Sequence, residues 1–253
     1  MEKAGIIRKQ TGENISPWAS PIVIVPKKTD VPGQFVPRLC IDYRRLNAIT
    51  VKDPEPLPNI DHVLATLGNG PRYFTSLDLF SGYHQIGMTA QAIERSAFIT
   101  PRGTYVYLRM PFGLCNAPGT FQRTMNEIFA DIINHWMMVY VDDVIIFTKT
   151  FQEHLDAIRE VFNKLKKRGL FIKPSKCSFA QFSAKFLGHI VDAQGNHPDP
   201  DKVKAVKEYP RPTNITEVRA FLGLASYYRR FIQGFSTIAR HLNKLLKKNT
   251  LFK

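Results

Sequence analysis

The chain has 253 residues, of which 44% are hydrophobic, so it is long enough to bury a core in one large or two modest domains. Lys and Arg together number 35 against 21 Asp and Glu, which gives a formal net charge of +14 at pH 7. This imbalance argues against a neutral or acidic partner and favours a polyanion such as nucleic acid. A merely soluble basic protein accounts for the charge alone equally well.

Cysteine usage and hydropathy exclude further classes. The three cysteines, Cys40, Cys115 and Cys177, lie far apart without a CxxC or Cys/His pattern, which argues against a zinc site or disulfide framework and for a reducing intracellular compartment. The most apolar stretch, residues 136–147, is interrupted by two aspartates, so we expect no membrane span. The N-terminal MEKAGIIRKQ lacks the apolar core of a signal peptide.

The first predicted elements are strands. Residues 21–26 and 38–42 are short β-rich runs, and the stretch TDVPGQFVP between them predicts a hairpin with an irregular tip. The proline-rich DPEPLP that follows excludes a regular helix or central strand. A short helix is predicted over residues 60–67, capped by Asn59 or Asp61.

The middle of the chain predicts a strand, a helix and a second hairpin. Residues 73–79 read as a strand, and apolar residues three and four apart predict an amphipathic helix over 119–136, entered through Pro118. Residues 136–141 and 144–147 are β-favouring runs separated only by Asp142 and Asp143. They predict a hairpin that carries both acids at its turn.

The last third shifts towards basic helices. A helix across residues 155–165 is expected to end at Gly169, followed by strands around 185–191 and a turn at 194–195. Residues 217–230 and 238–248 are the two best helical stretches after a boundary near 196. Because hairpins and helices mix without strict βα alternation, we expect an α+β fold with an antiparallel sheet.

Three aspartates are the candidate chemical groups. Asp78 lies inside the apolar run SLDLF, and Asp142 and Asp143 interrupt an apolar hairpin. Buried carboxylates are costly without a cation, and phosphoryl transfer uses two divalent cations about 3.5–4 Å apart that carboxylate oxygens hold. For any one of these residues alone, a turn acid or an ion-pair partner is the commoner explanation.

Four motifs in sequence order resemble those of reverse transcriptases. They are RLCIDYRRLN at 38–47, SLDLFSGYHQI at 76–86, RMPFGLCNAPGTFQ at 109–122 and YVDD at 140–143. The wording of SPWASPIVIVPKK, FLGHIV and FLGLASYYRRFI is similar to gypsy-type retrotransposons with long terminal repeats, and nearly the whole chain is covered. The resemblance implies a right-hand polymerase fold, with fingers at 1–53 and 86–116, palm at 54–85 and 117–195, and a partial thumb or connection at 196–253.

The resemblance also implies roles for single residues around the catalytic centre. Asp78, Asp142 and Asp143 match the ligands of two Mg²⁺ ions, for which Mn²⁺ is a possible substitute. Tyr83 matches the bulky ring that excludes a ribonucleotide 2′-hydroxyl; a core tyrosine is the alternative. The residues expected along the triphosphate are Leu79, Phe80, Ser81 and Gly82, the last permitting close approach.

Further residues are implied around the nucleotide and the primer. Arg38 matches the fingers arginine that clamps the triphosphate, with either Lys27 or Lys28 beside it, and Phe112 should pack under the nascent base pair, where Gly113 allows a close fit. The best match to a general acid for pyrophosphate is Lys176, with Lys173 as a near alternative. Phe186, Leu187 and Gly188 resemble the primer grip, and the C-terminal helices resemble the start of the thumb, although a plain structural bundle explains them too.

The predicted function is that of an RNA-directed DNA polymerase that uses an RNA or DNA template with a primer, and deoxynucleotides. The resemblance implies a fragment of a Pol polyprotein that also contains ribonuclease H and integrase domains and works in a cytoplasmic virus-like particle. The main alternative is a catalytically inert fragment that only binds nucleic acid. A viral RNA-templated RNA polymerase is disfavoured by Tyr83, and a glycosidase lacks any other supporting motif.

Overall fold

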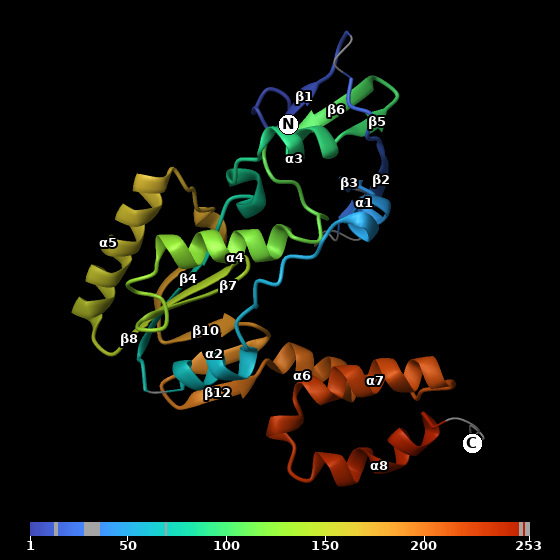
Figure 1. The fold of residues 1–253 in the computed structure, drawn as a ribbon. Coiled ribbons are helices and arrows are strands. Elements are labelled where there is room, and N and C mark those ends of the chain that lie inside the picture. The colour runs from blue at the N-terminus through green and yellow to red at the C-terminus, as the bar shows by residue number, and fades with distance from the viewer. Residues whose placement is uncertain (13–14, 28–35, 69, 248–249, 251–253) are drawn as a thin grey trace.

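The computed structural model describes residues 1–12, 15–27, 36–68, 70–247 and 250. Three sheets follow one another through the molecule, and a group of helices projects to one side at the C-terminal end (Figure 1). None of the described helices is both long enough and apolar enough to span a bilayer.

A five-stranded sheet in the order β1-β6-β5-β2-β3 forms one end of the molecule (Figure 1). Its elements are β1 (Ile7–Lys9), β2 (Ser20–Lys27), β3 (Val36–Ile41), β5 (Phe98–Thr100) and β6 (Gly103–Tyr107), with helices α1 (Arg44–Ile49) and α3 (Ala90–Arg95). The predicted β2–β3 hairpin is confirmed by six antiparallel residue pairs. Most of its expected irregular tip lies outside the described residues.

The central sheet has four antiparallel strands in the order β7-β8-β4-β9. Its elements are β4 (Tyr73–Asp78), β7 (Met137–Tyr140), β8 (Asp143–Thr148) and β9 (Ser178–Gln181), covered by α4 (Ala117–Ile128) and α5 (Phe151–Arg168). The short 3₁₀ helices η1 (Gly82–Gln85) and η2 (Pro174–Lys176) lie near the end of β4. This arrangement confirms the predicted antiparallel sheet.

The third layer contains β10 (Ser183–Phe186), β11 (His189–Asp192) and β12 (Gly195–Pro198), with α2 (Ile60–Leu67) beside them. The projecting C-terminal group is α6 (Pro200–Lys207), α7 (Ile215–Tyr227), η3 (Arg229–Phe231) and α8 (Phe235–Leu245). Helices α7 and α8 pack on each other around Val218, Leu222 and Ala239. The boundary expected near residue 196 falls within β12.

Burial on both faces explains the nearly continuous apolar runs of the central sheet. Successive strand residues point to opposite faces, so Val144 and Ile146 pack with α4 and α5, whereas Ile145 and Phe147 pack with α2 and β10. The two faces belong to separate hydrophobic clusters. Because a slip of one residue would exchange the two packed sets, this burial fixes the register of β8.

The helix expected over residues 119–136 is shorter than predicted. It includes Pro118 in its first turn but ends at Ile128, and Phe129 follows it as the cap. The next residues form tight turns in which the amides of Ile132 and Ile133 donate to the carbonyl of Phe129. Phe129 and Ile132 are still buried in the core, so the apolar periodicity continues beyond the helix itself.

Other boundaries also differ from the sequence-based expectations. The β7–β8 turn is displaced by one residue: Tyr140 pairs with Asp143, so the turn consists of Val141 and Asp142. The strands expected around 185–191 are β10 and β11, and they meet at a tight two-residue turn in which Leu187 and Gly188 both have positive φ. The helix predicted over 217–230 ends at Tyr227, and that predicted over 238–248 runs instead from Phe235 to Leu245.

Two predicted helix ends are confirmed, at Asn59 and Gly169. Asn59, rather than Asp61, caps α2, because its side chain accepts from the amides of Asp61 and His62. The long helix α5 begins at a capping box formed by Thr150 and Glu153 and ends, as predicted, at Gly169 in the left-handed conformation. These local signals fix where α5 starts and stops beside the central sheet.

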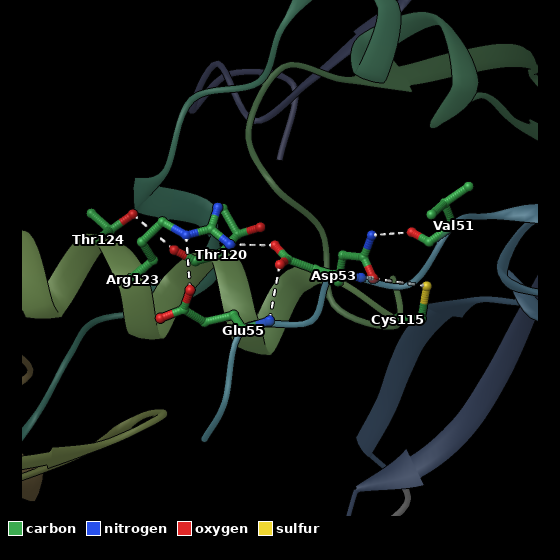
Figure 2. A network of polar contacts seen from close by, with 8 residues as sticks. Val51, Asp53, Glu55, Cys115, Thr120, Arg123 and Thr124 are labelled. Atoms are coloured by element: carbon green, nitrogen blue, oxygen red, sulfur yellow. Dashed lines mark hydrogen bonds and ion pairs between the residues drawn. The ribbon is translucent and has the colours of Figure 1, made fainter. Parts of the chain in front are cut away.

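A polar network joins the segment between α1 and α2 to helix α4 (Figure 2). Arg123 of α4 contacts Asp53 through Nη2 at 2.6 Å and Glu55 through Nε at 3.1 Å. Asn116, the residue before α4, accepts from the amide of Asp53 and donates to the carbonyl of Val51. The network therefore attaches the proline-containing connection to the central layer.

Candidate active site

The three predicted aspartates meet at one end of the central sheet. Asp78 is the last residue of β4 and pairs in register with Asp143, the first residue of β8, while Asp142 lies in the preceding turn. Burial, followed by the charges of Asp143 and Asp78, raises the pKa of Asp142. Burial and the charge of Asp78 likewise raise the pKa of Asp143. The fold thus brings together carboxylates that repel one another.

This donor set fits a hard divalent cation in its chemistry, since it offers carboxylate oxygens from adjacent strands. Among the residues that the structure describes, no three His, Cys, Asp or Glu side chains converge as ready-made ligands of one ion. Instead, Lys176 Nζ lies 3.3 Å from Asp78 Oδ2 and supplies a positive charge there.

Gln122 of α4 forms hydrogen bonds to the backbone at the β7–β8 turn. It is fully buried, its Oε1 accepts from the amide of Val141 at 2.8 Å, and its Nε2 donates to the carbonyl of Val139 at 3.1 Å. Val141 has φ +51, a left-handed conformation that is costly for a β-branched residue. The glutamine thus braces a strained residue directly before Asp142.

Tyr83 and Phe112 are adjacent, as the predicted nucleotide site requires. Their ring centroids are 4.9 Å apart, and Tyr83 also meets the edge of Phe121 at 5.4 Å. Tyr83 is 8% exposed, whereas Phe112 is 49% exposed, so the tyrosine is largely buried and the phenylalanine faces solvent. Burial, together with the charge of Asp142, raises the pKa of Tyr83 to about 12 and keeps it neutral.

Gly82 packs closely against the core and against Asp142. A Cβ atom at this position would lie 3.1 Å from the Phe121 ring and 3.3 Å from Asp142 Oδ1. The close approach is therefore to the core and to a candidate metal ligand.

The loop that carries the other predicted triphosphate residues has a fixed shape. Ser81 has φ +48, and Phe80 is 56% exposed, while Leu79 is buried. Gln85 donates to the carbonyls of Phe80 and Phe171, at 2.8 and 2.9 Å, and accepts from the amide of Phe171 at 2.7 Å. This side chain, for which the sequence motif implied no role, joins the loop to the segment after α5.

Of the two candidate loop lysines, only Lys176 has its ammonium group beside one of the three predicted aspartates. Lys173 approaches through its backbone instead, since its amide donates to the carbonyl of Asp78 at 2.8 Å. Cys177 Sγ accepts from the amide of Asp78 at 3.4 Å. The loop containing both lysines is thereby fastened to the end of β4.

The predicted triphosphate clamp is only partly described. Arg38 is exposed on β3 and pairs through its backbone with Val25 of β2. Lys27 ends β2, and Lys28 lies outside the described residues, so the structure does not decide between the two lysines. On the neighbouring segment, Gly113 has φ +94 and its carbonyl accepts from Asn47 of α1, which fixes the loop behind Phe112.

The predicted primer grip is a tight hairpin. Phe186 is 3% exposed and packs into the cluster beneath α2, whereas Leu187 and Gly188 form the turn between β10 and β11. The structure thus separates one anchoring residue from two turn residues. Nothing in the chain's propensities alone would have assigned these different roles.

The comparisons with known proteins agree with the resemblance that the sequence motifs show. The family model described as "Reverse transcriptase (RNA-dependent DNA polymerase)" matches residues 25–191. The Pol polyprotein of transposon 297 of Drosophila melanogaster is 49% identical over 250 residues, covering 99% of this chain and 23% of that protein. The Pol polyprotein of transposon gypsy of the same organism is 44% identical, covering 97% of this chain and 23% of that protein. The chain thus spans about a quarter of the length of these relatives.

Solved structures of foamy viral protease-reverse transcriptase have the same fold. One in complex with double-stranded DNA superposes with a TM-score of 0.86 and 26% identity, covering 97% of this chain and 41% of that one. Another, in complex with an RNA/DNA hybrid, gives 0.81 and 26%, covering 99% and 32%. The predicted polymerase fold and the predicted likeness to gypsy-type elements are confirmed. The chain belongs to the reverse transcriptase (RNA-dependent DNA polymerase) family.

Proposed function

We propose that this chain is an RNA-directed DNA polymerase that extends a primer with deoxynucleotides on an RNA or DNA template. The observation that carries the proposal is the in-register pairing of Asp78 with Asp143 beside Asp142. These three carboxylates lie at the end of a sheet buried on both faces. Family membership and a formal charge of +14 support a nucleic-acid substrate.

Asp78, Asp142 and Asp143 would hold two Mg²⁺ ions, with Mn²⁺ as a substitute. Bound there, divalent cations stabilise the charge on the attacking and leaving oxygens of phosphoryl transfer. The raised pKa values of Asp142 and Asp143 reflect a site whose charges lack sufficient compensation within the chain. A cation would supply that compensation.

The proposed reaction joins the primer 3′-oxygen to the α-phosphorus of a deoxynucleoside triphosphate. The bond between that phosphorus and the bridging oxygen breaks, pyrophosphate leaves, and the 3′-hydroxyl loses its proton to water. Lys176, whose ammonium already lies beside Asp78, would give a proton to the pyrophosphate. The Lys176 position favours this residue over Lys173, which meets Asp78 through its backbone.

The remaining predicted residues would orient the nucleotide. Tyr83 would lie beneath the sugar and exclude a 2′-hydroxyl, with Phe112 under the base pair. The segment from Leu79 to Gly82 would follow the triphosphate, and Arg38 would clamp it with a guanidinium fork. The exposed face of Phe112 and the exposed Arg38 are consistent with contacts that form only when substrate is bound.

The proposed organisation divides the chain into fingers (1–53 and 86–116), palm (54–85 and 117–195) and the start of a thumb (196–253). The five-stranded sheet corresponds to the fingers and the other two sheets to the palm. The projecting helices correspond to the start of the thumb (Figure 1). Because the matched relatives are Pol polyproteins, we also propose that ribonuclease H and integrase domains accompany this one in the parent protein.

The described site does not favour the alternative of an inert nucleic-acid-binding fragment. The three aspartates are present, and so are the hydrogen bonds from Gln122 and Gln85 that brace the turn and the loop beside them. A binding remnant would need neither the aspartates nor their supports.

The test is Mg²⁺-dependent extension of oligo(dT) on poly(rA) with dTTP, using the parent chain and an Asp142→Asn/Asp143→Asn variant. Asp156→Asn, on the exposed surface of α5, is the matched control for loss of an acid. We expect the double variant to lose roughly a thousandfold or more of the rate and the control to lose none. A folded parent that binds primer–template without extending it would overturn the proposal, as would equal rates in parent and double variant.

A further inference from the structure

Two adjacent tyrosines at the end of α7 contact the turn of the β10–β11 hairpin. The hydroxyl of Tyr227 donates to the carbonyl of Leu187 at 2.6 Å, and the hydroxyl of Tyr228 donates to the carbonyl of Gly188 at 2.9 Å. Both turn carbonyls therefore have a partner on a helix about 40 residues further along the chain. The two rings also pack edge to face, with centroids 5.0 Å apart.

Gly188 permits this contact. It has φ +71, and a Cβ atom there would lie 3.2 Å from the Tyr228 hydroxyl oxygen. Leu187 before it has φ +48, a conformation that side chains other than glycine adopt at a cost. The turn is thus held in a demanding shape by hydrogen bonds that come from outside the hairpin.

The residue after the turn strengthens the same contact. His189 is 2% exposed, and its ring stacks on Tyr227 at 5.4 Å and lies 5.5 Å from Tyr228 and 5.6 Å from Phe231. Beside it, Arg230 Nη1 contacts Asp61 Oδ1 of α2 at 3.0 Å. The end of α7 is therefore fixed to the third layer, whereas the rest of α7 and α8 forms a separate hydrophobic cluster.

We propose that Tyr227 and Tyr228 are positioning residues that hold the Leu187–Gly188 turn against the primer terminus and couple it to the α7–α8 helices. The inference rests on the proposed function, because it takes this hairpin as the element that aims the primer 3′-hydroxyl. Nucleotide addition is sensitive to that aim, since a displacement of about 1 Å can cost about a hundredfold in rate. The tyrosines contact the protein turn and need not touch the substrate.

The experiment compares single-nucleotide addition by the parent, Tyr227→Phe, Tyr228→Phe and the double variant. Tyr209→Phe is the matched control, because Tyr209 contacts Phe221 through its ring and its hydroxyl has no hydrogen-bond partner among the described residues. Removing only the hydroxyls keeps the rings packed around His189. We expect the double variant to lower the maximal rate about tenfold or more, while the apparent Kd for dTTP and the Tm stay near parent values.

A second readout separates positioning from general damage. With 2-aminopurine as the primer-terminal base, the double variant should increase fluorescence because the terminus is held less firmly, and Tyr209→Phe should not. An unchanged rate and unchanged fluorescence in the double variant would overturn the inference while the parent remains active. A parent that binds primer–template but adds no nucleotide would instead contradict the proposed function, and this result is read before any tyrosine variant is compared.

Discussion

Two antiparallel ladders of equal length differ in how much of the molecule supports them. The β4–β8 pair and the β2–β3 pair each align six residues on each strand. The first is covered by α4 and α5 on one face and by α2 and β10 on the other. The second exposes Ile24 to 59% and Leu39 to 41%, although these two residues are paired.

This difference in packing shows which candidate site residues are held in place by the fold. The aspartates stand at the end of the supported ladder, so packing on two faces determines their position before any substrate binds. Arg38 stands on the exposed ladder, where β2 continues beyond its pairing with β5 at Ser20 and Pro21, so this part of the hairpin has less packing to support it. We expect changes near the aspartates to affect stability and rate together, and changes on the β2–β3 hairpin to affect substrate affinity alone.

The largest expected effect on stability comes from Gln122→Met, which keeps the approximate volume but removes the hydrogen bonds to Val139 and Val141. Leaving one buried and one partly buried backbone group without partners should lower the free energy of unfolding by about 2–4 kcal/mol. Chemical denaturation measures this loss, and primer extension should fall with it. Thr124→Ala, on the same helix, is the control. A stable and fully active Gln122→Met protein would break the comparison.

Arg38→Ala should have the opposite profile. Loss of a charge-assisted contact of about 1.5–3 kcal/mol should raise the apparent Kd for dTTP by roughly 10- to 150-fold. The Tm should not change, because Arg38 is exposed and, among the described residues, its pairing with β2 is through the backbone. Single-turnover titrations with dTTP provide the measurement, with Arg8→Ala on β1 as a charge control. A fall in Tm without a change in Kd would show that the hairpin depends on this residue for folding.

The smallest effect is expected at the network that joins the two regions (Figure 2). Arg123 holds Asp53 and Glu55 at 2.6 and 3.1 Å, but its side chain is 44% exposed. Exposed ion pairs contribute about 0.2–1 kcal/mol. A double-mutant cycle with Arg123→Ala and Asp53→Ala should give a coupling energy in that range. A value near zero would mean that Asn116 and the prolines hold the connection without the ion pairs.

Sequence reasoning placed the aspartates and most of the strands because their signals are local. Apolar runs, turn residues and caps such as Asn59 and Gly169 act within a few neighbours. The helix expected as far as Trp136 ended early because apolar spacing records burial, and the turns after Ile128 bury the same residues. Short elements such as α1, α3 and β1 have too few residues to show a period.

The supports of the site were missed for a different reason. Gln122, Gln85 and Tyr228 act through hydrogen bonds to residues 17 to 86 positions away in sequence. Only the folded arrangement brings these pairs together. A polar residue within an otherwise apolar helical face, as Gln122 is on α4, was the one available signal.

The most direct test of the central claim is thermal unfolding of the parent and of the Asp142→Asn/Asp143→Asn variant, with and without Mg²⁺. A carboxyl whose pKa is raised in the folded state stabilises the fold at low pH, and that contribution is lost as the pH rises through the folded-state pKa. At neutral pH without metal, the crowding of these carboxyl groups therefore destabilises the fold, and the variant should unfold at a higher temperature than the parent.

Adding Mg²⁺ should reverse this order. A cation that binds only the folded parent stabilises it by about 2.7 kcal/mol at a concentration 100-fold above its Kd, which corresponds to a rise of several degrees in Tm. The variant, lacking two ligands, should not shift. Equal shifts in both proteins, or no shift in a folded parent that binds primer–template, would contradict the assignment of these aspartates to a metal site.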